Sequence, residues 1–163
     1  MTQVRPARPD ELAESGEVVV AAYDADGVIT AAHPYADDLR DAPGRARDSV
    51  VLVAVEDGEV VGAVTWCPVG SSHREVARGG EAEFRALGVL PRVRGRGIGE
   101  LLVRACLERA REEDYRVMVL SSGEWMAAAH RLYERLGFVR LPERDWSPVP
   151  GVRLLAYRLD LRP

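Results

Sequence analysis

The chain has 163 residues, of which 47% are apolar and 29% charged, and a formal net charge of −4. This size and composition suit one folded domain over residues 1–163 and exclude an intrinsically disordered chain. All 22 basic residues are arginine, which excludes a Walker A loop and Schiff-base chemistry, because both require lysine.

The same properties limit the partners that we expect. The acidic net charge argues against general binding to nucleic acid, for which a basic face is typical. No apolar run reaches the length needed to cross a membrane, and residues 1–10 lack the apolar stretch of a secretory signal. We therefore expect no nucleic-acid partner, no membrane partner and a cytoplasmic location. Cys67 and Cys106 are too few for a disulfide framework and are predicted to be plain thiols.

The first eighty residues predict a strand, two helices, a hairpin and a loop, at residues 4–6, 10–23, 35–46, 49–66 and 71–80. Asp10 can cap the first helix, and Pro43 interrupts the second. The pair Asp57-Gly58 lies between two β-branched runs and favours a hairpin turn.

The second half predicts strands at 82–90, 116–120, 138–141 and 152–161, and helices at 97–113 and 125–136. Gly137 stands where helices commonly end. Residues 142–151 are rich in proline and are expected to form a loop. The resulting order, β α α β β β α β α β β, defines a mixed α/β domain.

The most informative stretch joins the strand at 82–90 to the helix at 97–113, and it reads Arg94-Gly95-Arg96-Gly97-Ile98-Gly99. The first turn of a helix has N–H groups without partners and the positive end of the helix dipole. Glycines let a ligand approach those groups, and two cationic side chains lie among them, so we expect a bound phosphate or pyrophosphate. Glu100 stands where a GxGxxG dinucleotide loop has its third glycine, which argues against that class.

Three motifs and the order of elements resemble the GNAT superfamily of N-acetyltransferases. The loop matches the family form Arg/Gln-x-x-Gly-x-Gly/Ala as Arg94-x-x-Gly97-x-Gly99, and the strand before it is similar to the family's glutamate-bearing central strand. Residues 132–138, Leu-Tyr-Glu-Arg-Leu-Gly-Phe, are similar to the family's LYxxxGF. The resemblance covers almost the whole chain. It implies the GNAT-like acyl-CoA N-acyltransferase fold, an α/β fold whose mixed sheet has splayed central strands.

The resemblance also implies acetyl-CoA as the acyl donor. No metal is expected, because the three histidines, His33, His73 and His130, lack metal-ligand spacing. The pyrophosphate would be received by the backbone of Arg94, Gly95, Arg96, Gly97, Ile98 and Gly99. Pantetheine would lie beside the central strand and bond the backbone of Leu87, Gly88 and Val89. A glycine inside a strand is typical of a bulge or of a close backbone approach. A backbone N–H aimed at the thioester oxygen would stabilise its developing charge.

Glu83 is the candidate general base, directly or through a water, because the attacking amine must lose a proton. The alternative is a structural carboxylate paired with Arg85 on the same face of the strand. Tyr133 matches the family's general acid, which gives a proton to the departing thiolate, and its alternative is a buried aromatic residue.

The chain departs from the family pattern at one position of the pantetheine site. The family often has asparagine seven residues before this tyrosine, whereas this chain has Met126. The contact is therefore either absent or supplied by another residue, for which Ser121 and Ser122 are the candidates.

The region expected to hold the acceptor is rich in carboxylates, which would attract a cationic amine; they are Asp24, Asp26, Asp37, Asp38, Asp41, Glu143 and Asp145. We therefore expect direct transfer, in a ternary complex, to a primary amine of a small molecule. The alternatives are a protein or peptide N-acetyltransferase and a non-catalytic acyl-CoA-binding module, and Glu83 and Tyr133 argue against the second. Dimers are common in the family, so a homodimer is the assembly that the resemblance suggests.

Overall fold

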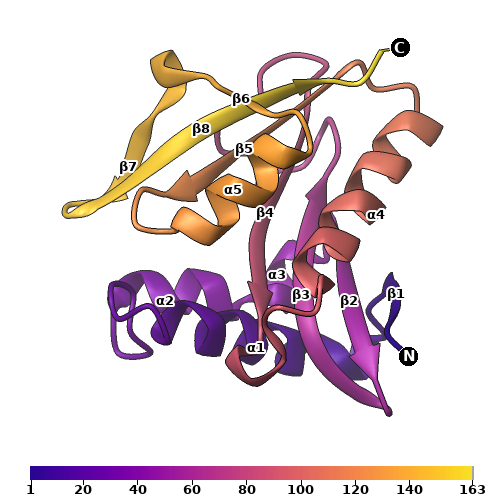
Figure 1. Cartoon of the computed structure of the whole chain (residues 1–163), viewed down its shortest axis with the longest axis vertical. Helices are drawn as coiled ribbons and strands as arrows, with labels where there is room; N and C mark the ends of the chain where they lie inside the picture. Colours follow the sequence, from indigo (N-terminus) through magenta and orange to yellow (C-terminus); the bar gives the residue numbers. More distant parts are fainter. Residues whose placement is uncertain (163) are drawn as a thin grey trace.

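One mixed sheet forms the centre of the computed structural model, which describes residues 1–162 (Figure 1). Its strands are β1 (Gln3–Pro6), β2 (Val50–Glu56), β3 (Glu59–Cys67), β4 (Ala82–Val89), β5 (Val117–Gly123), β6 (Val139–Arg140), β7 (Trp146–Val149) and β8 (Val152–Asp160). Their order is β1-β2-β3-β4-β5-β8-β6, with β7 paired to β8. β4 and β5 pair in parallel and their neighbours antiparallel. The predicted mixed α/β fold is confirmed.

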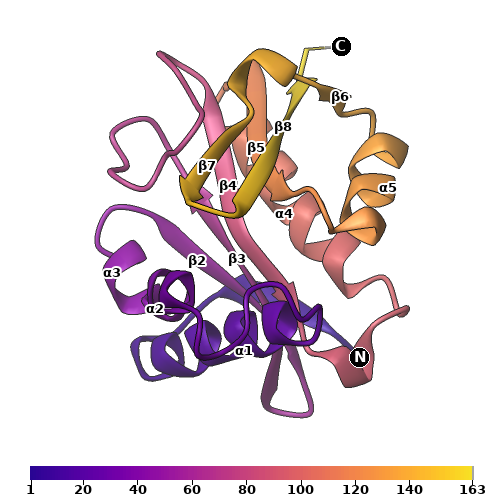
Figure 2. The same cartoon turned by 90° about the vertical axis from the view of Figure 1, so that its left-hand side faces the viewer.

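Helices cover both faces of this sheet (Figure 2). One face carries α1 (Leu12–Asp24), α2 (Pro34–Arg40) and α3 (Ala42–Arg45), and the other carries α4 (Ile98–Glu112) and α5 (Ala127–Arg135). Each face has its own hydrophobic cluster, because the buried sides of α1 and α4 pack on opposite sides of the strands. Within residues 1–162, no helix combines the length and apolar character needed to cross a membrane.

β4 and β5 pair only where they begin and then diverge (Figure 1). The pairing joins Ala82 to Met118 and Glu83 to Val119. Further along β4, the register against β3 shifts, and Ala86 takes a φ of 56°, which is rare for a residue other than glycine. The predicted splay of the central strands is therefore present, with a bulge on its β4 side.

The expected loop at 142–151 contains a strand, which corrects the sequence prediction. Trp146 pairs with Leu154, and Val149 pairs with Val152. Gly151, at a φ of 82°, lets the chain reverse between β7 and β8. The prolines in this stretch concealed a hairpin, because Pro148 lies in the short β7 and Pro150 in its turn.

Two predictions about the first helices were also wrong in detail. A short 3₁₀ turn precedes α1, and the Glu11 carboxylate, not Asp10, accepts the N–H of Arg8 at 2.8 Å. The second helical piece divides at Asp41, whose side chain accepts the N–H of Gly44 at 3.0 Å and caps α3. A capping carboxylate in mid-segment explains why one predicted helix is two.

Candidate active site

A cleft of about 540 Å³ opens where β4 and β5 diverge. Its walls come from the C-terminal end of α1, from β4, from the loop before α4, from the end of β5 and from α5. The predicted site residues that line it are Leu87, Gly88, Val89, Arg94, Gly95, Gly97, Ile98, Gly99 and Tyr133. The fold thus brings together three separate segments of the sequence. Arg96 and Glu83 are not among the lining residues.

The N-terminus of α4 presents free N–H groups to this cleft. Gly95 and Gly97 have φ values of 82° and 79°, in the left-handed region that favours glycine. Nothing lies within 4 Å of the place where a Cβ would stand at either residue. No backbone carbonyl of residues 1–162 accepts from the N–H groups of residues 95–100. The loop therefore fits an anion that can take several N–H bonds at the positive end of the helix dipole.

The two arginines of this loop have partners of their own. Arg94 donates to the carbonyl of Ala22 at 2.7 Å and lies 3.5 Å from Asp26, so it ties the loop to the end of α1. Arg96 pairs with Glu56 at 3.3 Å. The cradle is consequently built from backbone groups, and the expected contribution of both side chains to phosphate binding stays a prediction.

Gly88 lies where α1 approaches β4 most closely. A Cβ built there would stand 3.0 Å from both the Cβ of Ala22 and the Cα of Val19. The expected close backbone approach is confirmed, and the bulge begins just before it at Ala86. Since β5 has left β4 at this point, the edge of β4 beside Leu87 and Val89 is not used for sheet pairing with β5. Those backbone groups are open to a ligand in the cleft.

Tyr133 lies on α5, lines the cleft and is 4% exposed. Its ring packs among Phe84, Phe138 and Tyr157, with ring centroids 5.8 to 5.9 Å apart. Burial raises the pKa of the Tyr133 phenol well above its usual range, and the nearby Ser122 hydroxyl opposes that shift. The phenol therefore keeps its proton at neutral pH, as a general acid must.

The end of β5 carries the residues that stand near the expected pantetheine contact. Ser121, Ser122 and Met126 all line the cleft. The hydroxyl of Ser121 accepts from Nε1 of Trp146 at 3.2 Å, and that of Ser122 lies 3.9 Å from the sulfur of Met126. The indole N–H of Trp125, another lining residue, has no partner within residues 1–162. The assignment of a pantetheine contact to either serine stays a prediction.

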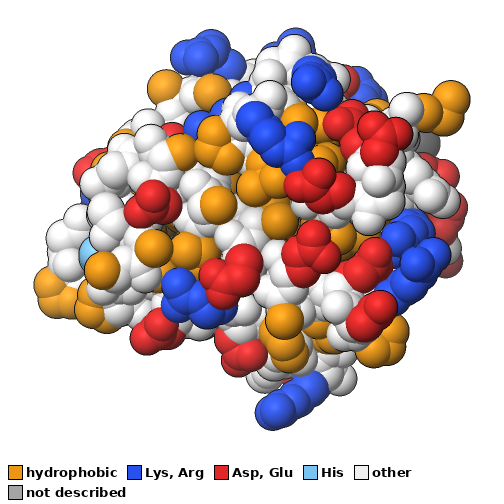
Figure 3. Space-filling model, turned by 90° about the horizontal axis from the view of Figure 1, so that it is seen from below, with side chains coloured by type: hydrophobic (Ala, Val, Ile, Leu, Met, Phe, Trp, Pro, Cys, Tyr) orange, Lys and Arg blue, Asp and Glu red, His pale blue; other side chains and the backbone are white. Residues whose placement is uncertain are grey.

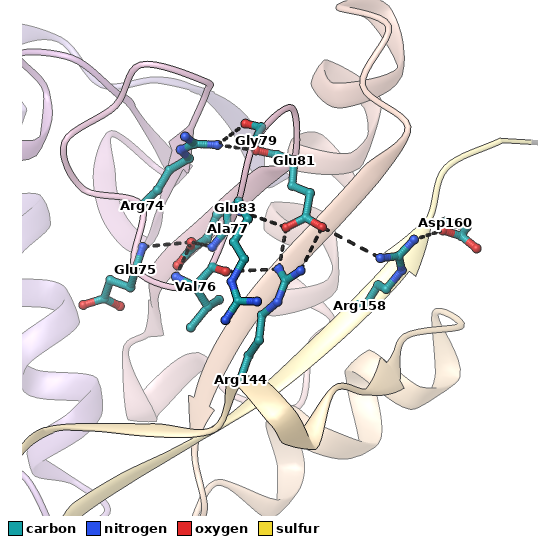
Figure 4. Close-up of polar contacts among 11 residues, drawn as sticks. Arg74, Glu75, Val76, Ala77, Gly79, Glu81, Glu83, Arg144, Arg158 and Asp160 are labelled. Atoms are coloured by element: carbon teal, nitrogen blue, oxygen red, sulfur yellow. Dashed lines mark hydrogen bonds and ion pairs between the residues drawn. The ribbon is translucent and has the colours of Figure 1, made fainter.

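Glu83 is fully buried and holds the loop before β4 (Figure 4). Its Oε1 accepts the N–H groups of Glu75, Val76 and Ala77, each at 2.9 Å, whereas Oε2 has no partner within residues 1–162. Burial raises the pKa of Glu83, and the three N–H bonds oppose that effect. Its role as general base stays a prediction; Oε2 is its unpartnered oxygen, and that atom is sealed from solvent.

A second group of charged side chains, Arg85 with Asp38 and Glu75, borders the cleft. Arg85 lines the cleft and is 7% exposed; its Nη2 lies 2.5 Å from Asp38 and 3.4 Å from Glu75. Burial raises the pKa of Glu75 to about 7, although Arg85 lowers it. The alternation of side chains along a strand predicts that Arg85 shares a face with Glu83. Glu75 lies in a polar loop, where no pattern in the sequence indicates that its side chain would reach Arg85.

Six of the seven carboxylates of the expected acidic rim have structural partners in the described part of the chain. Asp24 accepts the N–H of Ala31 at 2.8 Å, Asp37 pairs with Arg40 at 2.9 Å, and Asp145 pairs with Arg140 at 2.7 Å. Figure 3 shows the end of the molecule that carries α1, where acidic and basic side chains lie interspersed. Paired charges of both signs attract a cationic amine much less than a free acidic rim would. Within residues 1–162, no group of three or more His, Cys, Asp or Glu residues is placed to hold a metal ion.

Comparison with known proteins identifies the class to which this fold and cleft belong. A sequence model of the Acetyltransferase (GNAT) family matches residues 17–138, which include the phosphate loop and Tyr133. The chain belongs to the GNAT family of acetyltransferases, as the motifs predict.

Two kinds of relatives add detail. N-acetylaspartate synthetase of Rattus norvegicus is 39% identical over 112 residues, which are 68% of this chain and 35% of that protein. An uncharacterised N-acetyltransferase of Escherichia coli is 31% identical over 114 residues, which are 70% of this chain and 65% of that protein. The chain thus spans about a third of the length of the N-acetylaspartate synthetases that it matches.

Solved structures agree with the fold. A GNAT-family acetyltransferase of Staphylococcus aureus superposes with a TM-score of 0.75 at 14% identity, over 99% of this chain and all of that one. A GNAT-family acetyltransferase of Brucella melitensis in complex with acetyl-CoA superposes with a TM-score of 0.66 at 26% identity, over 100% of this chain and 90% of that one. Acetyl-CoA as the donor agrees with this second structure.

Proposed function

We propose that the chain is an acetyl-CoA-dependent N-acetyltransferase that transfers acetyl directly to a primary amine of a small molecule. The observation that carries the proposal is one continuous cleft with free backbone N–H groups at the start of α4 and the protonated phenol of Tyr133 on its wall. Acetyl-CoA supplies the activated acetyl group when it is bound.

The residues present fit that donor. The open space over Gly95 and Gly97 leaves room for a pyrophosphate close to the backbone. The edge of β4 beside Leu87 and Val89, which β5 does not use, can pair with the amide groups of pantetheine. Together these features would hold the thioester between β4 and Tyr133.

The proton transfers are assigned to two kinds of side chain. Tyr133 would give its proton to the sulfur as the thiolate departs, because the phenol is protonated and lines the cleft. A carboxylate would take the proton of the ammonium group, and the sequence assigns this role to Glu83, directly or through a water. Both roles rest on the family pattern.

Two observations support a small acceptor. The loop before β4 and the loop before β7 are joined by Glu81 and Arg144 at 2.5 Å, and Arg144 also donates to the carbonyl of Val76 at 3.1 Å. We expect this bridge to narrow the groove that a peptide would need. In addition, the name of the N-acetylaspartate synthetases describes a small acetylated product. The homodimer and the cytoplasmic location stay predictions.

The test is the release of free thiol from acetyl-CoA in the presence of small amines, polyamines, amino acids and peptides. We expect release with one class of small amine and a rise in melting temperature with acetyl-CoA alone. Faster release with peptides than with every small amine would contradict the small acceptor. Acetyl-CoA binding without release for any acceptor would instead indicate a non-catalytic binding module.

A further inference from the structure

Arg85 is a buried cation with unused hydrogen-bond donors. Its side chain is 7% exposed, and its hydrogen bonds, to Asp38 and to the hydroxyl of Tyr35, use Nη2 alone. Within residues 1–162, Nε and Nη1 have no hydrogen-bond partner, and neither atom is sealed from solvent. Arg85 lines the cleft, and we take these two donors to be the ones that a ligand in the cleft would reach. A guanidinium held in this way is suited to a carboxylate.

A second buried arginine strengthens the positive field at this place. Arg45 is 2% exposed and donates only to neutral groups, namely the hydroxyl of Thr65 and the carbonyls of Asp38 and Leu39. Its charge is therefore not cancelled by a bonded carboxylate. The charge of Arg45 acts on that of Arg85, so the two carboxylates beside Arg85, Asp38 and Glu75, stand against two cations, which favours an anionic ligand over a cationic one at this place.

Glu75 lies between Arg85 and a second hollow in the protein. A space of about 260 Å³ is lined by Glu75, by Trp146 and by residues of the loops 76–78 and 143–145. Glu75 lies 3.4 Å from Arg85 of the main cleft, and Trp146 donates to Ser121 of the main cleft. The two hollows are therefore adjacent at these contacts, and Glu75 lines the second of them. The side chain of Glu75 points away from Glu83, and only the backbone N–H of Glu75 takes part in the hydrogen bonds by which Glu83 holds the loop (Figure 4).

We propose that the part of the cleft beside Arg85 and Glu75 binds an acceptor with a carboxylate beside its amine, such as an amino acid. Arg85 would receive the carboxylate, and Glu75 would take the proton of the ammonium group. The inference rests on the proposed function, because it names the substrate class of the same cleft. In the reaction, the nitrogen–acyl bond forms as the carbon–sulfur bond breaks. One ammonium proton goes to Glu75, the sulfur takes the proton of Tyr133, and the second nitrogen proton restores the phenol.

The environment of Glu75 suits a general base. Its pKa of about 7 is close to neutral pH, where a base both exists in its ionised form and accepts protons well. The titratable and charged groups around it are Tyr23 of α1, Tyr35 and Asp38 of α2, Arg45 of α3, Glu83 and Arg85 of β4, and Glu143, Arg144 and Asp145 of the neighbouring loop. Burial outweighs the lowering effect of the arginines on its pKa.

The first experiment compares matched acceptors on the unaltered protein. Thiol release is measured with each of a panel of amino acids and with its carboxamide, which keeps the amine and the side chain. We expect kcat/KM to be about 10- to 150-fold higher for the acid, the range of one charge-assisted hydrogen bond. Equal rates for acid and amide would overturn the inference and leave the N-acetyltransferase function standing. No release with any acceptor would overturn the proposed function itself.

The second experiment assigns the residues. Arg85→Gln and Arg85→Lys should reduce the preference for the acid, with lysine retaining part of it because it keeps the charge. Arg40→Gln is the control, since Arg40 pairs with Glu17 and Asp37 outside the cleft. A thermal shift with acetyl-CoA verifies that each variant is folded. A full preference in both Arg85 variants would contradict the assignment of this residue.

Glu75 is tested by the pH dependence of kcat/KM. The unaltered protein should lose activity below about pH 7, which gives its pH profile an acidic limb. Glu75→Gln should remove this acidic limb and lower kcat/KM by about 10²- to 10⁴-fold. In Glu83→Gln the limb should remain. Loss of the limb in Glu83→Gln and its survival in Glu75→Gln would overturn the proposal and assign the base to Glu83.

Discussion

Gly88 of β4 and Val19 of α1 lie so close that no side chain fits between them. A Cβ at Gly88 would stand 3.0 Å from the Cα of Val19, which is tighter than ordinary van der Waals contact. Both partners are backbone or Cβ atoms, so neither can move without shifting α1 or β4. This contact fixes the end of α1, and the end of α1 in turn receives the side chain of Arg94 from the phosphate loop.

Gly88→Ala is therefore expected to destabilise the fold by about 1–3 kcal/mol, the usual result of overpacking a core. Urea unfolding measures the change. Gly80→Ala is the matched control, because no atom lies within 4 Å of its Cβ position and its φ is not in the left-handed region. Equal stability of the two variants would show that α1 moves away freely.

Gly97→Ala should weaken the binding of acetyl-CoA about tenfold or more, because its Cβ would occupy the space above the phosphate loop. The left-handed backbone at Gly97 adds about 1–2 kcal/mol of strain. Gly151→Ala isolates the strain, since Gly151 has a similar φ of 82° and open space but lies in the β7–β8 turn. Calorimetric titration should show weaker binding for Gly97→Ala alone.

Tyr133→Phe should lower kcat by about 10²-fold or more and leave the affinity for acetyl-CoA nearly unchanged, because the phenol acts on the departing thiolate. Tyr115→Phe is the control. The hydroxyl of Tyr115 accepts the N–H of Val69 at 2.8 Å, away from the cleft. Single-turnover kinetics with one acceptor separates chemistry from product release, and an unchanged chemical step would remove Tyr133 as the acid.

Glu83→Ala should destabilise the protein by about 3 kcal/mol, because three backbone N–H groups lose their acceptor. Glu83→Gln should be much milder, since its amide oxygen can accept the same bonds. Chemical denaturation of both variants at pH 7 measures the difference. If both variants were as stable as the unaltered protein, the loop at 75–77 would not depend on this anchor.

Stability should fall as pH rises from about 4.5 to 7, because the folded state holds a proton on Glu75 that the unfolded chain releases. The shift of its pKa from 4.5 to about 7 corresponds to about 3 kcal/mol at pH 8. Glu75→Gln should therefore be more stable than the unaltered protein at pH 8 and similar to it at pH 4.5. A constant difference across this range would show that Glu75 titrates normally.

The sequence predicted the donor half of the cleft much better than the acceptor half. Glycine spacing and the start of a helix have direct physical consequences for the backbone, so the loop at Gly95 and Gly97 was found from local pattern alone. The helix-face position of Tyr133 was predictable in the same way. These features depend on neighbours in the chain.

The acceptor half depends on contacts between distant segments. Asp38, Glu75 and Arg85 come from three elements, and only the folded chain sets their distances and burial. Whether a carboxylate such as Glu83 faces a cleft or anchors a loop depends on which backbone N–H groups reach it. The strand β7 was missed for a related reason, because its proline-containing sequence forms a strand only against β8.

The divergence of β4 and β5 also has a consequence for the behaviour of the protein in solution. After Glu83 and Val119, two strand edges face each other without pairing in the middle of the sheet. Unpaired edges are the places where foreign strands add to a sheet and where aggregation begins. A donor molecule in the gap would cover both edges. We therefore expect bound acetyl-CoA to slow aggregation that begins at these edges.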